Sequence, residues 1–294
     1  MRPIKNLSIG YLNKQNLVML CAALLAAGCF NAAKAQPPAN SAIKPLTLAP
    51  LSESEQQWVA DRVYQNECAS NPKYLTYWSQ AEEFPSFGIG HFIWYRQGQE
   101  QIYQQTFPQM VAYVSQYQAP PKWLAELKPF VAPWRNKAEF DQQSDSLQMR
   151  QLRDWLLASR RWQGAFIVDQ FTQRVASGLQ RPSLRPRQRL RYNAIIERML
   201  SFKQGRFALI DYVNFKGIGN SQEQYQGEQW GLFSVLEQMT SIDIDGLSNR
   251  VLLQKFIDAA KARLQRRVEL APKHRAEQRW LTGWFKRLDA YGKD

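Results

Sequence analysis

The chain has 294 residues, a formal net charge of +13 and 45% hydrophobic residues, so it can bury a sizeable core. It contains only two histidines, which excludes a histidine-rich zinc site, and we expect no metal ion and no organic cofactor. No internal repeat or low-complexity tract is present.

The first 35 residues have the pattern of a cleavable secretion signal. They carry Arg2, Lys5 and Lys14 and no acidic residue, followed by an apolar run over 17–30 and a small-x-small site at 33–35. The apolar run is too short to span a bilayer comfortably. We therefore expect residues 1–35 to be a signal peptide and the protein to be periplasmic or secreted.

A second processing site overlaps this signal. The segment Ala26-Ala27-Gly28-Cys29 resembles a bacterial lipobox, and lipidation of Cys29 would make the protein a membrane-tethered lipoprotein. Cleavage after residue 35 instead leaves Cys68 as the one cysteine, so no internal disulfide can form. A membrane is expected as a partner only if Cys29 is lipidated.

The mature chain remains basic, because the signal removes four basic residues and no acid and so lowers the net charge from +13 to +9. An exported basic protein meets the anionic polymers of the cell envelope rather than nucleic acid. We expect a monomer that binds no nucleic acid.

Helical periodicity dominates the chain after a Pro-rich leader at 36–51. Ser52 and Glu55 form a capping-box pattern, which predicts a helix that ends at Glu67 or Cys68. The other predicted helices are 107–117, 121–127, 147–178, 186–202, 205–215, 229–239, 248–270 and 273–291. The pattern predicts a mostly α domain over 52–294 with one small β element at about 84–95.

Glu67 shares one face of the first predicted helix with Val59 and Val63. Because a face with two valines turns inward, Glu67 should lie at the C-terminal end of the helix in a partly apolar setting. Burial and the negative end of the helix dipole both favour the protonated carboxyl there. A protonated carboxyl can donate a proton to a leaving glycosidic oxygen, so Glu67 is the candidate general acid.

The segment 84–95 combines two closely spaced glycines, Gly88 and Gly90, with alternating apolar residues. The glycines allow close approach of a ligand to the backbone, and the alternation suits a short strand. A glutamate that ends an early helix, followed by Ser86-Phe87-Gly88-Ile89-Gly90-His91, resembles the lysozyme superfamily.

In phage-type lysozymes the catalytic glutamate ends the first helix and a Thr-x-Gly-x-Gly-His strand follows, so the resemblance implies that Glu67 is the catalytic acid. Goose-type lysozymes and lytic transglycosylases have a similar Ser-x-Gly-x-x-Gln segment, in which His91 would replace the glutamine. The resemblance implies a lysozyme-like domain with a small β-hairpin beside the catalytic cleft. The substrate-binding residues that it implies are Ser86, Gly88, Gly90, His91, Trp94 and Glu83.

The chain departs from the phage-type pattern between Glu67 and Gly88. The spacing is longer, and the intermediate aspartate of that family has no equivalent, although Glu82 and Glu83 lie in the interval. If either glutamate reaches the cleft, a water-using muramidase is favoured, because inverting and retaining glycosidases use two carboxylates. If neither does, the alternative is a lytic transglycosylase that uses Glu67 alone.

A glycine-rich stretch begins at Asn214 and includes Tyr225-Gln226-Gly227, which is similar to the late Tyr-Asn-x-Gly segment of lytic transglycosylases. That resemblance implies a catalytic role for Tyr225, opposite Glu67 and hydrogen-bonded to the acid or the sugar. The alternative is a buried tyrosine in an interhelical loop. Tyr212 and Glu228 are further candidates for the same role.

Two other classes of function compete with glycan cleavage. Cys68 and His91 would serve a cysteine peptidase or amidase if they meet in space. Ten tryptophans and the basic charge would equally serve a non-catalytic protein that binds the cell wall. The expected function is an exported, lysozyme-like muramidase, a glycoside hydrolase that cleaves the glycan strands of peptidoglycan with Glu67 as general acid.

Overall fold

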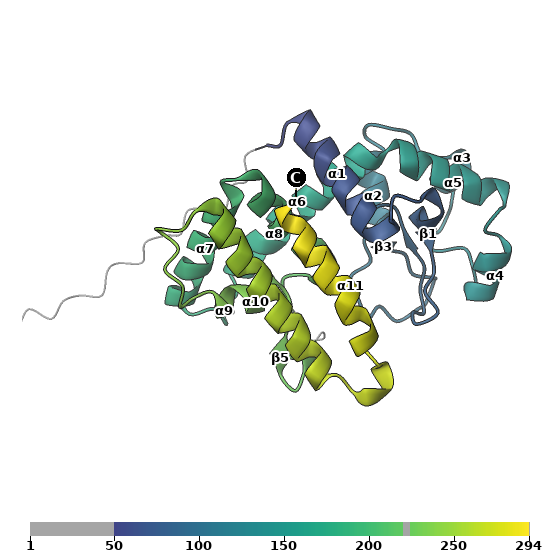
Figure 1. Cartoon of the computed structure of the whole chain (residues 1–294). Coiled ribbons are helices and arrows are strands. Elements are labelled where there is room, and N and C mark those ends of the chain that lie inside the picture. Colours follow the sequence, from purple (N-terminus) through teal and green to yellow (C-terminus); the bar gives the residue numbers. More distant parts are fainter. Residues whose placement is uncertain (1–49, 220–223, 294) are drawn as a thin grey trace, which may run out of the picture. The chain divides into compact units, whose positions relative to one another are not determined.

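Helices dominate the structure, a computed structural model that describes residues 50–219 and 224–293 (Figure 1). The mostly α class is therefore confirmed. The signal peptide, its lipobox and most of the predicted leader lie outside the described residues. None of the helices in the described part has the length and apolar character that a bilayer crossing requires.

The described elements follow one another along the chain. The α-helices are α1 (Glu53–Cys68), α2 (Phe107–Val114), α3 (Lys122–Ala125), α4 (Lys137–Gln142), α5 (Leu147–Ala158), α6 (Arg160–Leu179), α7 (Pro186–Leu200), α8 (Lys203–Lys216), α9 (Leu232–Gln238), α10 (Asn249–Leu270) and α11 (Gln278–Asp289). The 3-10 helices are η1 (Pro72–Leu75), η2 (Lys273–Arg275) and η3 (Ala290–Gly292), and the strands are β1 (Thr76–Tyr77), β2 (Ser86–Phe87), β3 (Phe92–Ile93), β4 (Gln224–Tyr225) and β5 (Glu228–Gln229).

Helix α1 begins at the predicted capping box. The Ser52 hydroxyl accepts a hydrogen bond from the Glu55 amide at 3.3 Å, and Glu55 Oε2 accepts one from the Ser52 amide at 3.0 Å. The helix ends at Cys68 because Ala69 adopts the left-handed conformation, with φ 50°. This fixed length places Glu67 in the last turn, as predicted.

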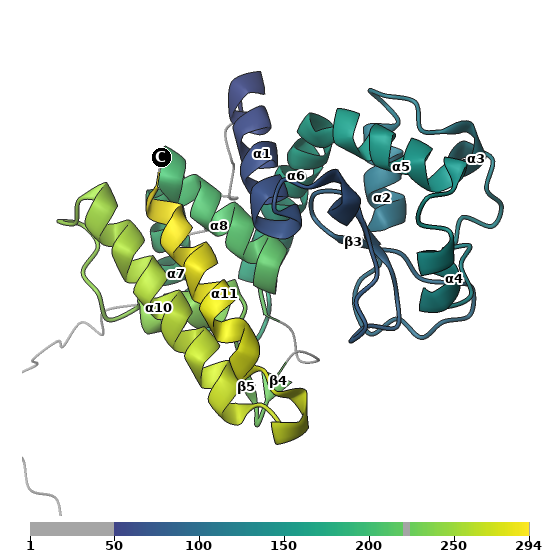
Figure 2. The same cartoon turned by 45° about the vertical axis from the view of Figure 1, so that its right-hand side comes forward.

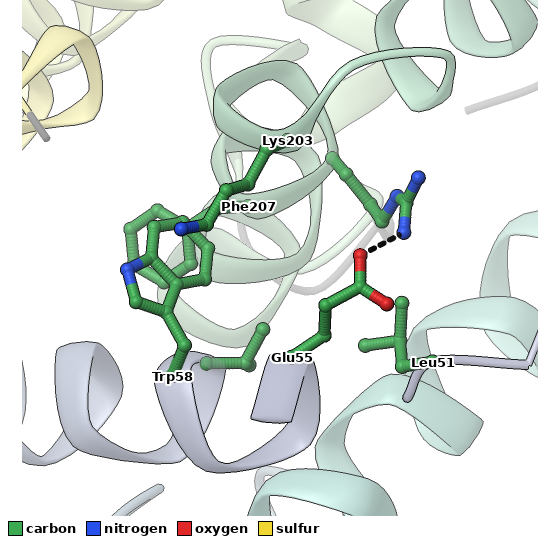
Figure 3. A pocket seen from close by; sticks show the side chains of 7 residues that line it. Leu51, Glu55, Trp58, Lys203 and Phe207 are labelled. Carbon is green, nitrogen blue, oxygen red and sulfur yellow. Dashed lines mark hydrogen bonds and ion pairs between the residues drawn. The ribbon is translucent and has the colours of Figure 1, made fainter. Parts of the chain in front are cut away.

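The first turns of α1 pack on α8 (Figure 3). Arg206 Nη1 donates to Glu55 Oε1 at 2.8 Å, and Lys203 Nζ lies 4.3 Å from the ring centroid of Trp58. Trp58 also meets Phe207 edge to face, at 5.1 Å between ring centroids. These contacts couple the helix that carries Glu67 to a helix about 150 residues later in the chain.

The predicted single helix over 147–178 is wrong, because the chain forms two helices, α5 and α6, with a break at Ser159. Ser159 is fully buried. Gln163 Nε2 stabilises the break by donating to the Leu156 carbonyl at 2.6 Å and to Ser159 Oγ at 2.9 Å. Gln163 Oε1 accepts a hydrogen bond from the Ile89 amide at 2.9 Å, which ties α6 to the turn of the β-sheet.

The predicted hairpin is part of a three-stranded antiparallel sheet in the order β1-β2-β3. Phe87 of β2 pairs with Thr76 on one side and with Phe92 on the other. Strand β1 lies before the predicted β element at 84–95 and was not predicted, because its two residues alone show no alternation. A separate hairpin, β4 and β5, turns through Gln226 and Gly227, both with positive φ, as tight two-residue hairpin turns require.

Helix α6 packs against α1, α2 and α8. Gly164 permits the close approach of α1, because a Cβ at this position would lie 2.7 Å from the Cβ of Ala60. At the other end of the chain, α11 lies beside α10 (Figure 1 and Figure 2) and also contacts η3, which packs on α8. The last helix is thereby brought to the helices that form the site.

Candidate active site

The turn between β2 and β3 consists of Gly88, Ile89, Gly90 and His91. Gly88 has φ 72°, and a Cβ there would lie 2.4 Å from Gln163 Oε1. A Cβ on Gly90 would lie 2.8 Å from the ring of Phe92. The glycines therefore let the turn pack tightly against its own sheet and α6.

The Glu67 carboxylate lies among three polar side chains from distant segments. Its Oε1 accepts hydrogen bonds from Arg287 Nη2 at 2.8 Å and from Asn214 Nδ2 at 3.3 Å. His91 Nδ1 lies 3.8 Å from Oε2. The Glu67 side chain is 16% exposed, so its carboxylate lies at the boundary between core and solvent.

The predicted protonated state of Glu67 is wrong. Burial raises the pKa of this carboxyl, but the positive charges of Arg287 and His91 and the hydrogen bond from Arg287 together bring the pKa below its ordinary value. Glu67 is therefore ionised at neutral pH. The prediction considered only the helix that carries Glu67, whereas the dominant cation lies 220 residues later.

Arg287 joins α1, α8 and α11 in a buried charge network. Its Nε and Nη2 each donate to Asp211 at 2.8 Å, while Nη2 also donates to Glu67. Asp211 accepts further hydrogen bonds from the Tyr291 hydroxyl at 2.7 Å and from Asn66 Nδ2 at 3.3 Å. Asp211 and Tyr291 are fully buried. One guanidinium thus bridges two carboxylates and holds Glu67 in a fixed position.

His91 lies between Glu67 and Cys68 and lines the cleft described below. Its Nε2 is 3.7 Å from Cys68 Sγ, and its ring stacks on Tyr77 with centroids 5.8 Å apart. The φ of His91 is 47°, a left-handed conformation that costs a residue other than glycine roughly 1–2 kcal/mol. A histidine at this position indicates that the imidazole makes interactions, here with Glu67, Cys68 and Tyr77, that a glycine could not make.

Cys68 meets His91 in space, as the peptidase hypothesis requires. The cysteine is fully buried, however, and this burial together with the charge of Glu67 raises the pKa of its thiol to about 12. A thiol that stays protonated at neutral pH is a poor nucleophile. The surroundings of Cys68 therefore argue against cysteine catalysis.

A cleft of about 1070 Å³ passes over this site. The predicted substrate-binding residues that line it are Ser86, Gly90, His91 and Glu83. Glu67 itself is not among the lining residues, but two of its direct neighbours, His91 and Asn214, are, so its carboxylate lies one side chain behind the cleft wall. The structure thus brings the candidate acid and most of the predicted binding residues together.

Both Glu82 and Glu83 line the cleft, from the loop between β1 and β2. Trp78 Nε1 donates to the Glu82 carbonyl at 2.9 Å and so fixes this loop. Glu82 is exposed, yet the partial loss of water around its carboxyl raises the pKa. The site therefore combines a carboxyl with a lowered pKa behind the cleft wall, Glu67, and a carboxyl with a raised pKa that lines the cleft, Glu82.

Two predicted binding residues do not line the cleft. Trp94 is fully buried, with its ring centroid 4.7 Å from that of Phe107 and 5.6 Å from that of Phe87. The prediction that Trp94 contacts substrate is therefore wrong, because its side chain belongs to the aromatic core. Gly88 is also buried, and it accommodates Gln163 rather than a ligand.

Tyr225 was predicted to hydrogen-bond Glu67 or the sugar, and the first of these alternatives is wrong. The Tyr225 hydroxyl donates to Glu277 Oε1 at 2.7 Å, and Tyr225 does not line the cleft. The two weaker candidates are engaged elsewhere too. Tyr212 is fully buried and donates to the Trp230 carbonyl at 2.7 Å, and Glu228 pairs with two arginines of α10.

Four residues of the site were not predicted: Arg287, Asp211, Gln163 and Asn214. Asn214 begins the glycine-rich stretch that the sequence singles out, so a signal existed there. Arg287 carried no such signal, because a basic residue in an amphipathic C-terminal helix normally faces water. The position of Gln163 depends on a helix break that periodicity does not show.

In residues 50–219 and 224–293, no three His, Cys, Asp or Glu side chains are arranged to hold a metal ion. Comparison of the chain with protein-family models, with curated proteins and with solved structures found no match. A functional assignment therefore rests on the geometry of the cleft and of the carboxyl groups around it.

Proposed function

We propose that the protein is an exported enzyme that cleaves the glycan strands of peptidoglycan, as a lysozyme-like glycoside hydrolase. The observation that carries the proposal is the position of Glu67, at the end of α1 and beneath a large cleft lined by Ser86, Gly90 and His91. A cleft of this size can accommodate several sugar rings. The half-buried tryptophans Trp280 and Trp284 line it, and tryptophan side chains commonly pack against sugar rings.

In this proposal Glu67 protonates the leaving glycosidic oxygen. Because Arg287 and His91 lower the pKa of Glu67, the acid form is scarce at neutral pH, and the rate of cleavage should rise as pH falls. Glu82 supplies the second carboxyl and acts on the attacking water. The presence of Glu82 and Glu83 in the cleft supports hydrolysis over transglycosylation.

The opposite pKa shifts also support a reversed assignment of the two roles. Glu82, with the raised pKa, would then donate the proton, and the ionised Glu67 would act as nucleophile, base or electrostatic partner. An aryl glycoside of an N-acetylglucosamine oligomer distinguishes the assignments, since its leaving group departs without protonation. Glu82→Gln keeps activity on this substrate if Glu82 is the donor, and Glu67→Gln keeps it if Glu67 is the donor.

The proposed function itself is tested with the mature protein and purified cell-wall sacculi. We expect soluble muropeptides to be released, and we expect Glu67→Gln to slow release by about 10²-fold or more. Cys68→Ala is the matched control and should remain active. Full activity of Glu67→Gln would remove the basis of the proposal, whereas loss of activity in Cys68→Ala alone, with peptide products, would favour the cysteine hypothesis. Mass spectrometry then separates hydrolysis, which leaves a reducing end, from transglycosylation, which leaves an anhydro end.

A further inference from the structure

The side chains that line the cleft carry an excess of positive charge. Among the lining residues that the structure describes, five are lysine or arginine and two, Glu82 and Glu83, are acidic. The acidic pair belongs to the loop between β1 and β2. The basic residues come from helical elements or directly follow one: Arg174 lies in α6 and Arg181 just after it, Lys216 ends α8, Arg267 lies in α10 and Arg275 in η2.

Arg174 illustrates this excess. Its Nη2 donates to the uncharged Gln104 Oε1 at 3.4 Å, and among the residues that the structure describes no carboxylate forms an ion pair with it. Burial lowers the pKa of its guanidinium, as expected for a cation that loses water without gaining an anion. An anionic ligand in the cleft would supply the missing partner.

Arg267 and Arg275 share one carboxylate. Glu277 is almost completely buried and accepts hydrogen bonds from Arg267 Nε at 2.7 Å and from Arg275 Nε at 3.0 Å. Arg275 therefore shares its carboxylate partner with a second cation. Trp284 lies in the same region, with its ring centroid 5.3 Å from the Arg267 guanidinium and 5.9 Å from the ring of Trp280.

We propose that these basic side chains bind the carboxylates that peptidoglycan carries on its peptide stems, or on lactyl groups without a stem, so that the enzyme prefers an anionic strand to a neutral glycan. This inference rests on the proposed function, whose substrate class it narrows. Sugar rings stack on Trp280 and Trp284 while the carboxylates pair with the arginines.

The test measures binding by calorimetry in a Glu67→Gln background, which prevents turnover. The probes are soluble glycan strands in native form, the same strands with carboxylates converted to amides by carbodiimide and ammonia, and strands stripped of their peptide stems. We expect native strands to bind about tenfold or more tightly than amidated strands, as for one or two charge-assisted hydrogen bonds. Arg174→Gln combined with Arg275→Gln should abolish this preference.

Arg187→Gln is the matched control, because this exposed arginine of α7 does not line the cleft and its loss changes the net charge by the same amount per site. Loss of Arg275 leaves Glu277 bonded to Arg267 and Tyr225, so the fold should survive. Circular dichroism checks this. If the double variant unfolds, the single variant Arg174→Gln, which breaks one long hydrogen bond, gives the same comparison.

Equal binding of native and amidated strands overturns the inference, and so does a preference that persists in the arginine variant. Removal of a stem hydrolyses the amide that joins it to the lactyl carboxyl and frees a lactyl carboxylate. Tight binding of stripped strands therefore shows that the arginines accept a lactyl carboxylate, whereas weak binding assigns the contact in native strands to the stem carboxylates. Cleavage by the wild-type protein is measured separately. An active enzyme without a charge preference overturns this inference alone, whereas preferential binding without any cleavage overturns the hydrolase proposal and supports the anion site.

Discussion

Replacing Arg287 with methionine removes the cation that Glu67 and Asp211 share. The change deletes three hydrogen bonds of 2.8 Å. It leaves two carboxylates without their guanidinium partner: Asp211, which is fully buried, and Glu67, whose side chain is 16% exposed. Loss of one partner of a buried ion pair costs about 3–5 kcal/mol. We therefore expect the free energy of unfolding at pH 7 to fall by about 3–5 kcal/mol, measured by urea unfolding and far-UV circular dichroism.

The pH dependence tests the same reasoning. The folded-state pKa of Glu67 is lowered, so the stability that its ionised form contributes is present above the ordinary pKa of a glutamate and is lost as pH falls through the lowered value. The difference between wild type and Arg287→Met should therefore shrink below about pH 4. Lys122→Met is the control, because Lys122 and its partner Glu126 are both well exposed, and it should leave stability unchanged. A loss of less than about 1 kcal/mol in Arg287→Met, or a difference independent of pH, would refute the argument.

Three further predictions concern the turn and its neighbours. Gly90→Ala places a Cβ 2.8 Å from the Phe92 ring, so we expect it to lower the free energy of unfolding by about 1–3 kcal/mol, measured by thermal unfolding. Gly246→Ala is the control and should be neutral, because a Cβ there meets open space. His91→Gly should gain roughly 1 kcal/mol of stability by relieving the left-handed backbone but lose muropeptide release; unchanged activity would show that the imidazole is dispensable. Cys68 should resist iodoacetamide at pH 8 in the folded protein and react in urea, because burial raises the pKa of its thiol to about 12. Mass spectrometry measures the labelling, and rapid labelling of the folded protein would contradict the prediction.

The parts of the site that sequence reasoning predicted are those with local signals. The capping box at Ser52 determines where α1 begins, and the helix period then places Glu67 in its last turn. The glycine spacing likewise indicates a tight turn at Gly88 and Gly90, although Gly88 accommodates Gln163 instead of a ligand. Local patterns therefore identified the elements that carry the site.

The protonation of Glu67 and the role of Tyr225 depend on contacts between distant segments. Arg287 determines the charge state of Glu67, and Glu277 accepts the hydrogen bond of the Tyr225 hydroxyl. Neither pairing can be predicted from the periodicity of the sequence. Trp94 was misplaced for a related reason. An aromatic residue in a short strand points either to the cleft or to the core, and only the packing of the sheet decides between them.

The hydrogen bond between Glu67 and Arg287 joins residues 220 positions apart. On a chain that is still being synthesised, α1 and the β-sheet emerge long before α11, so the carboxylate exists for most of that time without the cation that holds it. Closing so long a loop is entropically costly and slow, and the site is therefore completed among the last events of folding. An unfinished chain would carry Glu67 without the guanidinium that fixes it, so any chemistry that depends on the position of this carboxylate would have to wait until α11 has been made.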